Sequence, residues 1–158
     1  MRINATSLVV LKMETLLIAF TKQTDYGLIA LHFLAARFYE DRATNARTIA
    51  QECLLPSELL AKTMQLLAKN GLVESKNGPK GGYVLARHPS SITVAEVIRA
   101  IEGPIAIAGC QISNASNCEQ YRNCSIFHPM GQLQGRINEL LEEMTIFDLA
   151  GMPAGEIK

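Results

Sequence analysis

Three cysteines, Cys110, Cys118 and Cys124, lie within fifteen residues of one another in the C-terminal half of the chain. Seven residues separate the first two and five separate the second two, in a stretch rich in Asn, Ser and Gln. This spacing differs from the close C-x2-C pairs of zinc fingers and zinc ribbons. Cysteines on a longer loop can instead surround an iron–sulfur cluster, which thiolates bind through sulfur. The spacing therefore favours an iron–sulfur site.

Three thiolates leave one coordination position of such a cluster to another ligand. An oxygen or nitrogen ligand is weaker and more exchangeable, so the cluster would be lost, oxidised or attacked easily, which suits a sensor. His128 follows the cysteines directly and is one candidate for this position. The same residues also allow a zinc site with one histidine, redox-active thiols that form disulfides, or a chance grouping of cysteines. Spacing alone leaves these alternatives open.

Three amphipathic patterns upstream of the cysteines predict helices over residues 22–39, 46–53 and 56–69. In the third pattern, apolar residues such as Leu60 and Leu67 line one face, and a polar stripe lines the other. Two helices joined by a tight turn, the second with such a stripe, are typical of a helix-turn-helix. An ordinary helix that is buried on one side and solvated on the other gives the same stripe.

A hairpin pattern follows the third helix directly. Segments 72–76 and 82–86 predict two short strands, because the glycine-rich sequence between them favours a turn. This order is typical of a winged helix, in which a helix contacts bases in the major groove and the hairpin holds phosphates. We therefore prefer DNA binding, with Glu58, Lys62 and Gln65 expected near base edges and Lys69, Lys76 and Lys80 near phosphates. Asn77 of the wing is also expected to bind DNA.

The C-terminal half predicts a helix over 94–102, a loop over 105–128 and a long helix that starts at Pro129. Apolar residues recur every three or four positions along this last helix, which is typical of a coiled-coil seam. We expect the helix to form a homodimer, which would present two recognition helices to two DNA half-sites. Packing of the seam on its own domain is the alternative. The seam residues are Met130, Leu133, Ile137, Leu140, Met144 and Phe147.

Composition sets the broad class of the protein. The 158 residues are 48% apolar and 19% charged, without Trp and with zero net charge, which excludes a disordered chain. No apolar run approaches the roughly 18–20 residues of a membrane span, and no clean signal peptide is present, so we expect a soluble cytoplasmic protein. The sequence shows no Ser/Cys–His–Asp catalytic triad, no phosphate-binding loop and no paired carboxylates, so we expect that the protein is not an enzyme.

These elements predict a mainly α fold with three parts. Residues 1–20 form an N-terminal extension, 21–88 a winged helix-turn-helix DNA-binding domain, and 89–158 a helix, the cysteine loop and a long C-terminal dimerisation helix. The middle part holds nine basic and six acidic side chains, and the last part holds four and eight. A mildly basic part joined to an acidic one fits two roles in one chain.

Several motifs along the chain resemble the Rrf2 family of bacterial transcription regulators, over about residues 20–150. The resemblance includes the three cysteines and the order of four runs. These runs are Thr24-Asp25-Tyr26-Gly27-Leu28, Asn70-Gly71-Leu72-Val73-Glu74-Ser75, Gly78-Pro79-Lys80-Gly81-Gly82-Tyr83 and Ile98-Arg99-Ala100-Ile101-Glu102-Gly103-Pro104.

The resemblance implies a homodimeric transcription regulator, expected to be a repressor that binds promoter DNA, each subunit with a [2Fe–2S] or [4Fe–4S] cluster that senses nitric oxide, redox state, iron or cluster supply. The three cysteines match the family's cluster ligands. The fourth ligand implied is Asp25 of the partner subunit, or His128, which lies one residue later than the family's usual spacing. The wing departs from the family pattern, with Asn77 in place of an Arg and Lys80 in place of a Gly. A zinc-binding or thiol-switch regulator without a cluster is the alternative function.

Overall fold

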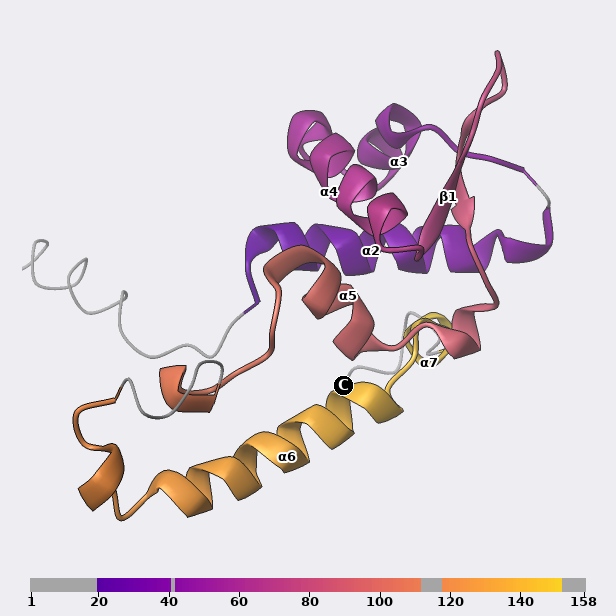
Figure 1. Cartoon of the computed structure of the whole chain (residues 1–158). Helices are drawn as coiled ribbons and strands as arrows, with labels where there is room; N and C mark the ends of the chain where they lie inside the picture. The colour runs from indigo at the N-terminus through magenta and orange to yellow at the C-terminus, as the bar shows by residue number, and fades with distance from the viewer. Residues whose placement is uncertain (1–19, 41, 112–117, 152–158) are drawn as a thin grey trace, which may run out of the picture.

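The computed structural model describes residues 20–40, 42–111 and 118–151. The predicted N-terminal extension therefore lies outside the described residues, except for Phe20. The molecule is mainly helical, with one small sheet, and the long helix α6 extends away from the other helices (Figure 1). The helices are α2 (Lys22–Ala36), α3 (Ala46–Glu52), α4 (Ser57–Lys69), α5 (Val94–Glu102), α6 (Phe127–Glu143) and α7 (Ile146–Gly151), and the strands are β1 (Val73–Lys76) and β2 (Gly82–Leu85).

Local capping explains where the first helices begin. The side chain of Thr21 accepts a hydrogen bond from the backbone N–H of Thr24, and Asn45 does the same for Thr48 at the start of α3. Pro56 is the N-cap of α4 and not its first residue, so the helix begins at Ser57, one residue later than the sequence predicted. These helices bury a common apolar core, whose fully enclosed side chains include Leu31, Ile49, Leu60, Met64 and Leu67.

A glycine lets α2 approach two other helices closely. A Cβ atom on Gly27 would lie 2.6 Å from Ile101 Cδ1 of α5 and 3.3 Å from Thr63 Cγ2 of α4. Because Gly27 has no side chain, α2 packs directly on both helices. This contact fixes the orientation of α4, the predicted recognition helix, relative to the start of α2.

The wing is an antiparallel hairpin with a third backbone segment at its base. Strands β1 and β2 pair from Val73↔Leu85 to Lys76↔Gly82. Thr44 then adds to β2: its N–H donates to the Tyr83 carbonyl at 3.0 Å, and the Tyr83 N–H donates to the Thr44 carbonyl at 2.8 Å. The winged helix-turn-helix predicted from the sequence is therefore confirmed.

The long C-terminal helix differs from its prediction at both ends. It begins at Phe127, before Pro129, and ends at Glu143, so the predicted seam residue Phe147 lies on the separate helix α7. The break has a tertiary cause, because the Val94 N–H donates to the Met144 carbonyl at 2.8 Å and the Ile146 N–H donates to the Ile92 carbonyl at 2.9 Å. Ile146 is fully buried as a result.

The remaining differences concern short turns. The first helix ends at Ala36, and a separate 3-10 turn follows at Phe38–Glu40. The described part of the predicted loop over 105–128 contains the 3-10 turns η3 (Gly109–Gln111) and η5 (Tyr121–Asn123), and the first residues of α6. Across the described parts of the chain, no helix is both long and apolar enough to cross a membrane.

Candidate functional site

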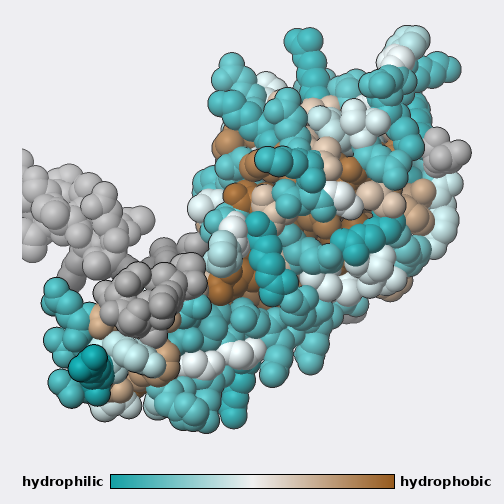
Figure 2. Space-filling model, viewed as in Figure 1, coloured by the Kyte–Doolittle hydropathy of each residue, from teal (hydrophilic) through white to brown (hydrophobic). Residues whose placement is uncertain are grey.

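The polar stripe of α4 faces solvent. Glu58, Lys62, Gln65 and Lys69 are all exposed, whereas Leu60, Met64 and Leu67 on the opposite side are fully buried. The space-filling view shows hydrophilic side chains across the top of the molecule, where α4 and the tip of the wing lie (Figure 2). The predicted base-contacting residues therefore share one accessible helix face with no competing core contact.

The predicted wing residues are also exposed and lie beside that face. Lys76, Asn77 and Lys80 have exposed side chains on or next to the hairpin. The ammonium group of Lys76 forms an ion pair with Glu74 at 2.7 Å. Lys80 forms no ion pair with any other described residue, so its charge is available to an external anion.

Sequence reasoning missed two arginines near the wing. A hollow of about 510 Å³ between α2 and the hairpin is lined by Arg37 and Arg42 together with Lys76 and Lys80. Arg37 is already engaged, since its guanidinium lies 3.7 Å from the Phe33 ring centroid and 3.0 Å from a Glu52 carboxylate oxygen. No linear pattern signals this group, because α2 and the hairpin meet only in the folded chain.

The three cysteines lie on the connection between α5 and α6. Cys110 is in η3 and half-buried, Cys118 is exposed, and Cys124 is half-buried at the end of η5; all three are free thiols. Residues 112–117, between the first two cysteines, lie outside the described part of the chain. No group of three or more His, Cys, Asp or Glu side chains among residues 20–40, 42–111 and 118–151 lies close enough together to hold a metal ion.

The two candidates for a fourth ligand lie on different helices. Asp25 is in the first turn of α2, where its carboxylate forms an ion pair with Lys22 at 3.4 Å. His128 is the second residue of α6 and is exposed. The donor set fits an iron–sulfur cluster in its chemistry, because it offers three unpaired thiols with a carboxylate or an imidazole. The described residues do not gather these donors into one group.

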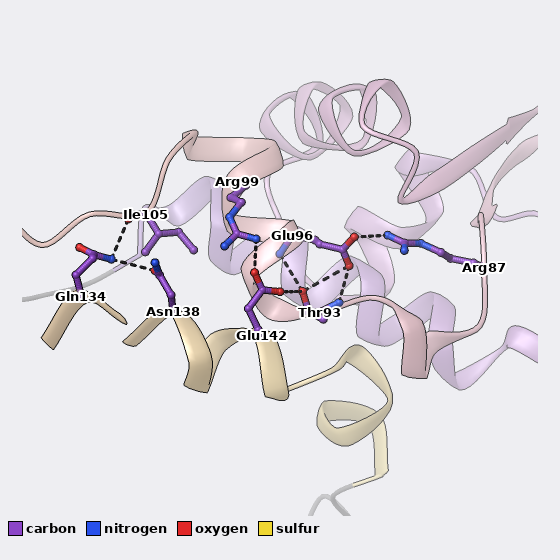
Figure 3. A network of polar contacts seen from close by, with 8 residues as sticks. All are labelled: Arg87, Thr93, Glu96, Arg99, Ile105, Gln134, Asn138 and Glu142. Atoms are coloured by element: carbon purple, nitrogen blue, oxygen red, sulfur yellow. Dashed lines mark hydrogen bonds and ion pairs between the residues drawn. The ribbon is translucent and has the colours of Figure 1, made fainter. Parts of the chain in front are cut away.

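The first limb of the cysteine connection is hydrogen-bonded to α6. Gln134, which is only 8% exposed, accepts from the Ile107 N–H at 2.8 Å and donates to the Ile105 carbonyl at 3.0 Å. Its amide also donates to Asn138 Oδ1 at 2.9 Å (Figure 3). The sequence pattern gave no sign of this role, because Gln134 lies between two apolar seam positions and resembles an ordinary surface residue.

A second set of polar contacts connects the wing with α6 (Figure 3). Arg87, just after β2, forms an ion pair with Glu96 at 2.6 Å, and Glu96 also accepts from the Thr93 N–H at 2.9 Å. On the same helix α5, Arg99 forms an ion pair with Glu142 of α6 at 2.5 Å. Burial raises the pKa of Glu96, but the hydrogen bonds from Arg87 and Thr93 outweigh it, so that pKa lies below its usual value.

Comparisons with known proteins agree on one family. The model of the Rrf2 family, described as an iron-dependent transcriptional regulator, matches residues 20–151. A putative helix-turn-helix transcriptional regulator of Aquifex aeolicus is 32% identical over 132 residues, which cover 82% of this chain and 90% of that protein. The transcriptional regulator NsrR of Bacillus licheniformis is 29% identical over 129 residues, which cover 82% of this chain and 90% of NsrR.

A solved structure with a similar fold is that of CymR, the global cysteine regulator of Bacillus subtilis. It superposes with a TM-score of 0.68 at 29% sequence identity, and the match covers 85% of this chain and 97% of CymR. The structure of IscR from T. potens superposes with a TM-score of 0.62 at 28% identity, covering 84% of this chain and 85% of IscR. These relatives are transcription regulators, and none of them is named as an enzyme.

Proposed function

Because the chain belongs to the Rrf2 family of transcription regulators, we propose that it binds double-stranded promoter DNA as a homodimer and that an iron–sulfur cluster controls its promoter occupancy. One observation carries the proposal above the others: the exposed stripe of α4 and the basic wing lie in the same chain as three free thiols on one connection. A DNA-binding head and a redox-sensitive donor set are thus combined in one small protein.

The DNA-binding head, which consists of the helices α2 to α4 and the wing, supplies contacts to bases and contacts to phosphates. The exposed polar side chains of α4 are suited to base edges in the major groove, where Gln, Lys and Glu each recognise different donor and acceptor patterns. Lys69 at the end of α4 and Lys80 on the wing are suited to phosphates, which fix the register of the protein on the duplex. Arg42, at the hollow beside the wing, adds a further cation for the DNA backbone.

The cysteine connection supplies the control. Cys110, Cys118 and Cys124 would hold the cluster, with Asp25 of the partner subunit or His128 as the fourth ligand. When bound, an iron–sulfur cluster supplies an iron centre that nitric oxide, oxidants or iron depletion can alter. A signal changes DNA affinity only through a difference in cluster binding between two forms of the dimer. A coupling of about 1–3 kcal/mol would change DNA affinity by roughly 5–150-fold.

Dimerisation is proposed from the exposed apolar seam of α6. Leu133 is 47% exposed and Leu140 60%, on a helix whose N-terminal part extends away from α2, α3 and α4 (Figure 1), and Met144, directly after that helix, is 39% exposed. Apolar side chains at this spacing gain burial against a second helix of the same kind. The alternative of a seam covered by its own domain does not account for these exposed positions.

The decisive experiment is anaerobic purification followed by an absorption spectrum and by iron and sulfide analysis. The proposal expects visible absorption and at least two irons per chain. It also expects promoter DNA affinity to differ between the wild type and a variant with all three cysteines replaced by Ala. A colourless protein with stoichiometric zinc, or one without metal whose cysteines form disulfides on oxidation, would instead establish the zinc or thiol-switch alternative.

A further inference from the structure

The side chain of Gln134 binds the backbone of the connection between α5 and α6 that contains the cysteines. The side-chain amide accepts from the N–H of Ile107 and donates to the carbonyl of Ile105, two residues apart on the same segment. An extended neighbouring strand would offer the same donor and acceptor pair. The third amide hydrogen bond, to Asn138, uses the remaining N–H of the Gln134 side chain and fixes its orientation.

A second contact continues the attachment towards Cys110. The side-chain amide of Gln111 lies 3.7–4.0 Å from the position that a Cβ atom on Gly131 would occupy. Gly131 is three residues before Gln134, so the limb from Ile105 to Gln111 lies against α6 and extends towards its N-terminus. The same side chain donates weakly to the sulfur of Cys110 at 3.9 Å. Cys110 is therefore held next to the first turns of α6.

Cys124 is attached to the same end of α6 by the chain itself, because it lies three residues before the first residue of that helix, Phe127. The two contacts of residues 105–111 with α6 therefore bring Cys110 to the end of α6 near which Cys124 lies in the chain. Without them, only the remainder of the connection would limit the separation of the two thiols. Bringing Cys110 and Cys124 to one cluster would then close a longer free loop, at an additional cost in conformational entropy.

We propose that Gln134 is a positioning residue that prepares the cysteine connection to hold its cluster, an inference that rests on the proposed function. Gln134 touches no cysteine. It acts through the backbone of residues 105–107, and its three hydrogen bonds explain why a buried polar amide is tolerated between the seam residues Leu133 and Ile137. The variant Gln134→Leu removes both backbone hydrogen bonds while it keeps the side chain's approximate size and its preference for a helix.

The test compares Gln134→Leu with Gln132→Leu, an exposed glutamine on the same helix, first in the protein without iron. In Gln134→Leu, the amide of Ile107 should exchange with deuterium about tenfold faster than in the wild type, because it loses its acceptor. Cys110 should be alkylated several-fold faster, whereas Cys53, directly after α3, serves as the internal reference with an unchanged rate. Gln132→Leu should match the wild type in both measurements.

The second half of the test uses reconstituted protein. Iron and the visible absorption bands should be lost several-fold faster from Gln134→Leu than from Gln132→Leu on passage over a chelating resin. Unchanged Ile107 exchange and Cys110 alkylation would overturn the positioning role, and so would faster exchange with unchanged iron loss. If the wild type itself took up no iron, the proposed function would fail, and the positioning of Cys110 would stand or fall on the exchange and alkylation rates alone.

Discussion

The carboxylate of Glu102, the last residue of α5, accepts a hydrogen bond of 2.5 Å from the hydroxyl of Thr24 in the first turn of α2. The same oxygen accepts from the backbone N–H and the hydroxyl of Thr21 at 2.9 and 3.0 Å. Glu102 directly precedes the segment that leads to the cysteines, and Thr24 directly precedes Asp25. One side chain thus connects the entrance of the cysteine connection with the start of the first helix of the DNA-binding head.

Glu102→Gln should therefore lower stability in a pH-dependent way. Burial raises the pKa of Glu102, but the hydrogen bonds from Thr24 and Thr21 outweigh it, so that pKa lies below the usual glutamate value of about 4.3. The stabilisation by the charged form is complete above that value and is lost as the pH falls through the lower folded-state pKa. Chemical unfolding should show a loss of about 1 kcal/mol or less at neutral pH, which shrinks below about pH 4.

The matched control for this prediction is Glu139→Gln on the exposed side of α6, which has no hydrogen bond or ion pair among the described residues. A pH-independent difference between Glu102→Gln and the wild type would contradict the assigned role of the carboxylate.

Gly82→Ala should destabilise the wing. Gly82 has φ near +156°, and a Cβ atom there would overlap the backbone of Thr44 and Asn45, which cannot move away as a flexible side chain would. We expect a loss of about 1–3 kcal/mol in thermal or denaturant unfolding. Gly71→Ala is the comparison, because Gly71 has φ near +71° but open space around it and loses only its backbone preference, about 1 kcal/mol. Equal losses for the two variants would show that the contact with Thr44 has no energetic weight.

Lys80→Ala should weaken binding to every DNA sequence to a similar degree. The side chain is exposed on the wing and forms no ion pair with the rest of the described chain. Loss of one phosphate contact should make the slope of log affinity against log salt concentration less steep by about one. Fluorescence anisotropy at several salt concentrations measures this slope, with Arg136→Ala on α6 as the control. A change in sequence preference at constant slope would refute the phosphate assignment.

Gln65→Ala should change sequence preference instead. Gln65 lies in the middle of the exposed stripe of α4, where a side-chain amide can form paired hydrogen bonds with an adenine edge. We expect a loss of about 1–3 kcal/mol on the preferred operator and relaxed discrimination at one base pair, with the salt slope unchanged. Selection of bound sequences from a random DNA library measures this directly. An unchanged sequence logo would remove Gln65 from the recognition surface.

Leu140→Asp should separate the proposed dimer without unfolding the chain. Leu140 is 60% exposed in the isolated chain, so the substitution leaves the core intact but places a charge in the apolar seam. Light scattering should then give a mass near 17.3 kDa, with circular dichroism unchanged, and operator affinity should fall because only one half-site is bound at a time. Glu143→Ala, off the seam, should stay dimeric; a dimeric Leu140→Asp protein would place the interface elsewhere.

The fold could be predicted from the sequence where its signals are local. Asn45 and the Asn70-Gly71 pair mark helix ends through interactions within a few residues, and the glycine-rich turn marks the hairpin. The end of the long helix could not be predicted, because the three- and four-residue spacing of apolar side chains continues from α6 into α7. The break depends on backbone hydrogen bonds between Met144 or Ile146 and residues about fifty positions earlier.

The same distinction applies to the candidate site. Exposure of the α4 stripe follows from helical periodicity, so its accessible face could be predicted. The hollow lined by Arg37 and Arg42, and the attachment of residues 105–107 to Gln134, depend on which elements meet in space. The spacing of the three cysteines also identified them as a group, but it gave no information on the contacts that hold the segment between α5 and α6 in place.

The backbone hydrogen bonds at Met144 and Ile146 join the C-terminal end of α6 to the beginning of α5 in the same chain. With Ile146 fully enclosed, no freely rotating joint separates the long helix from the winged head. In the proposed dimer, a twist of one α6 about the other would therefore swing α4 through a comparable angle. A helix of 17 residues is about 25 Å long, so a small rotation of α6 about one end moves the other end by several ångströms. The recognition helix α4 would be displaced along the DNA by a similar distance. Operator spacing would then be sensitive to the torsional state of this single helix.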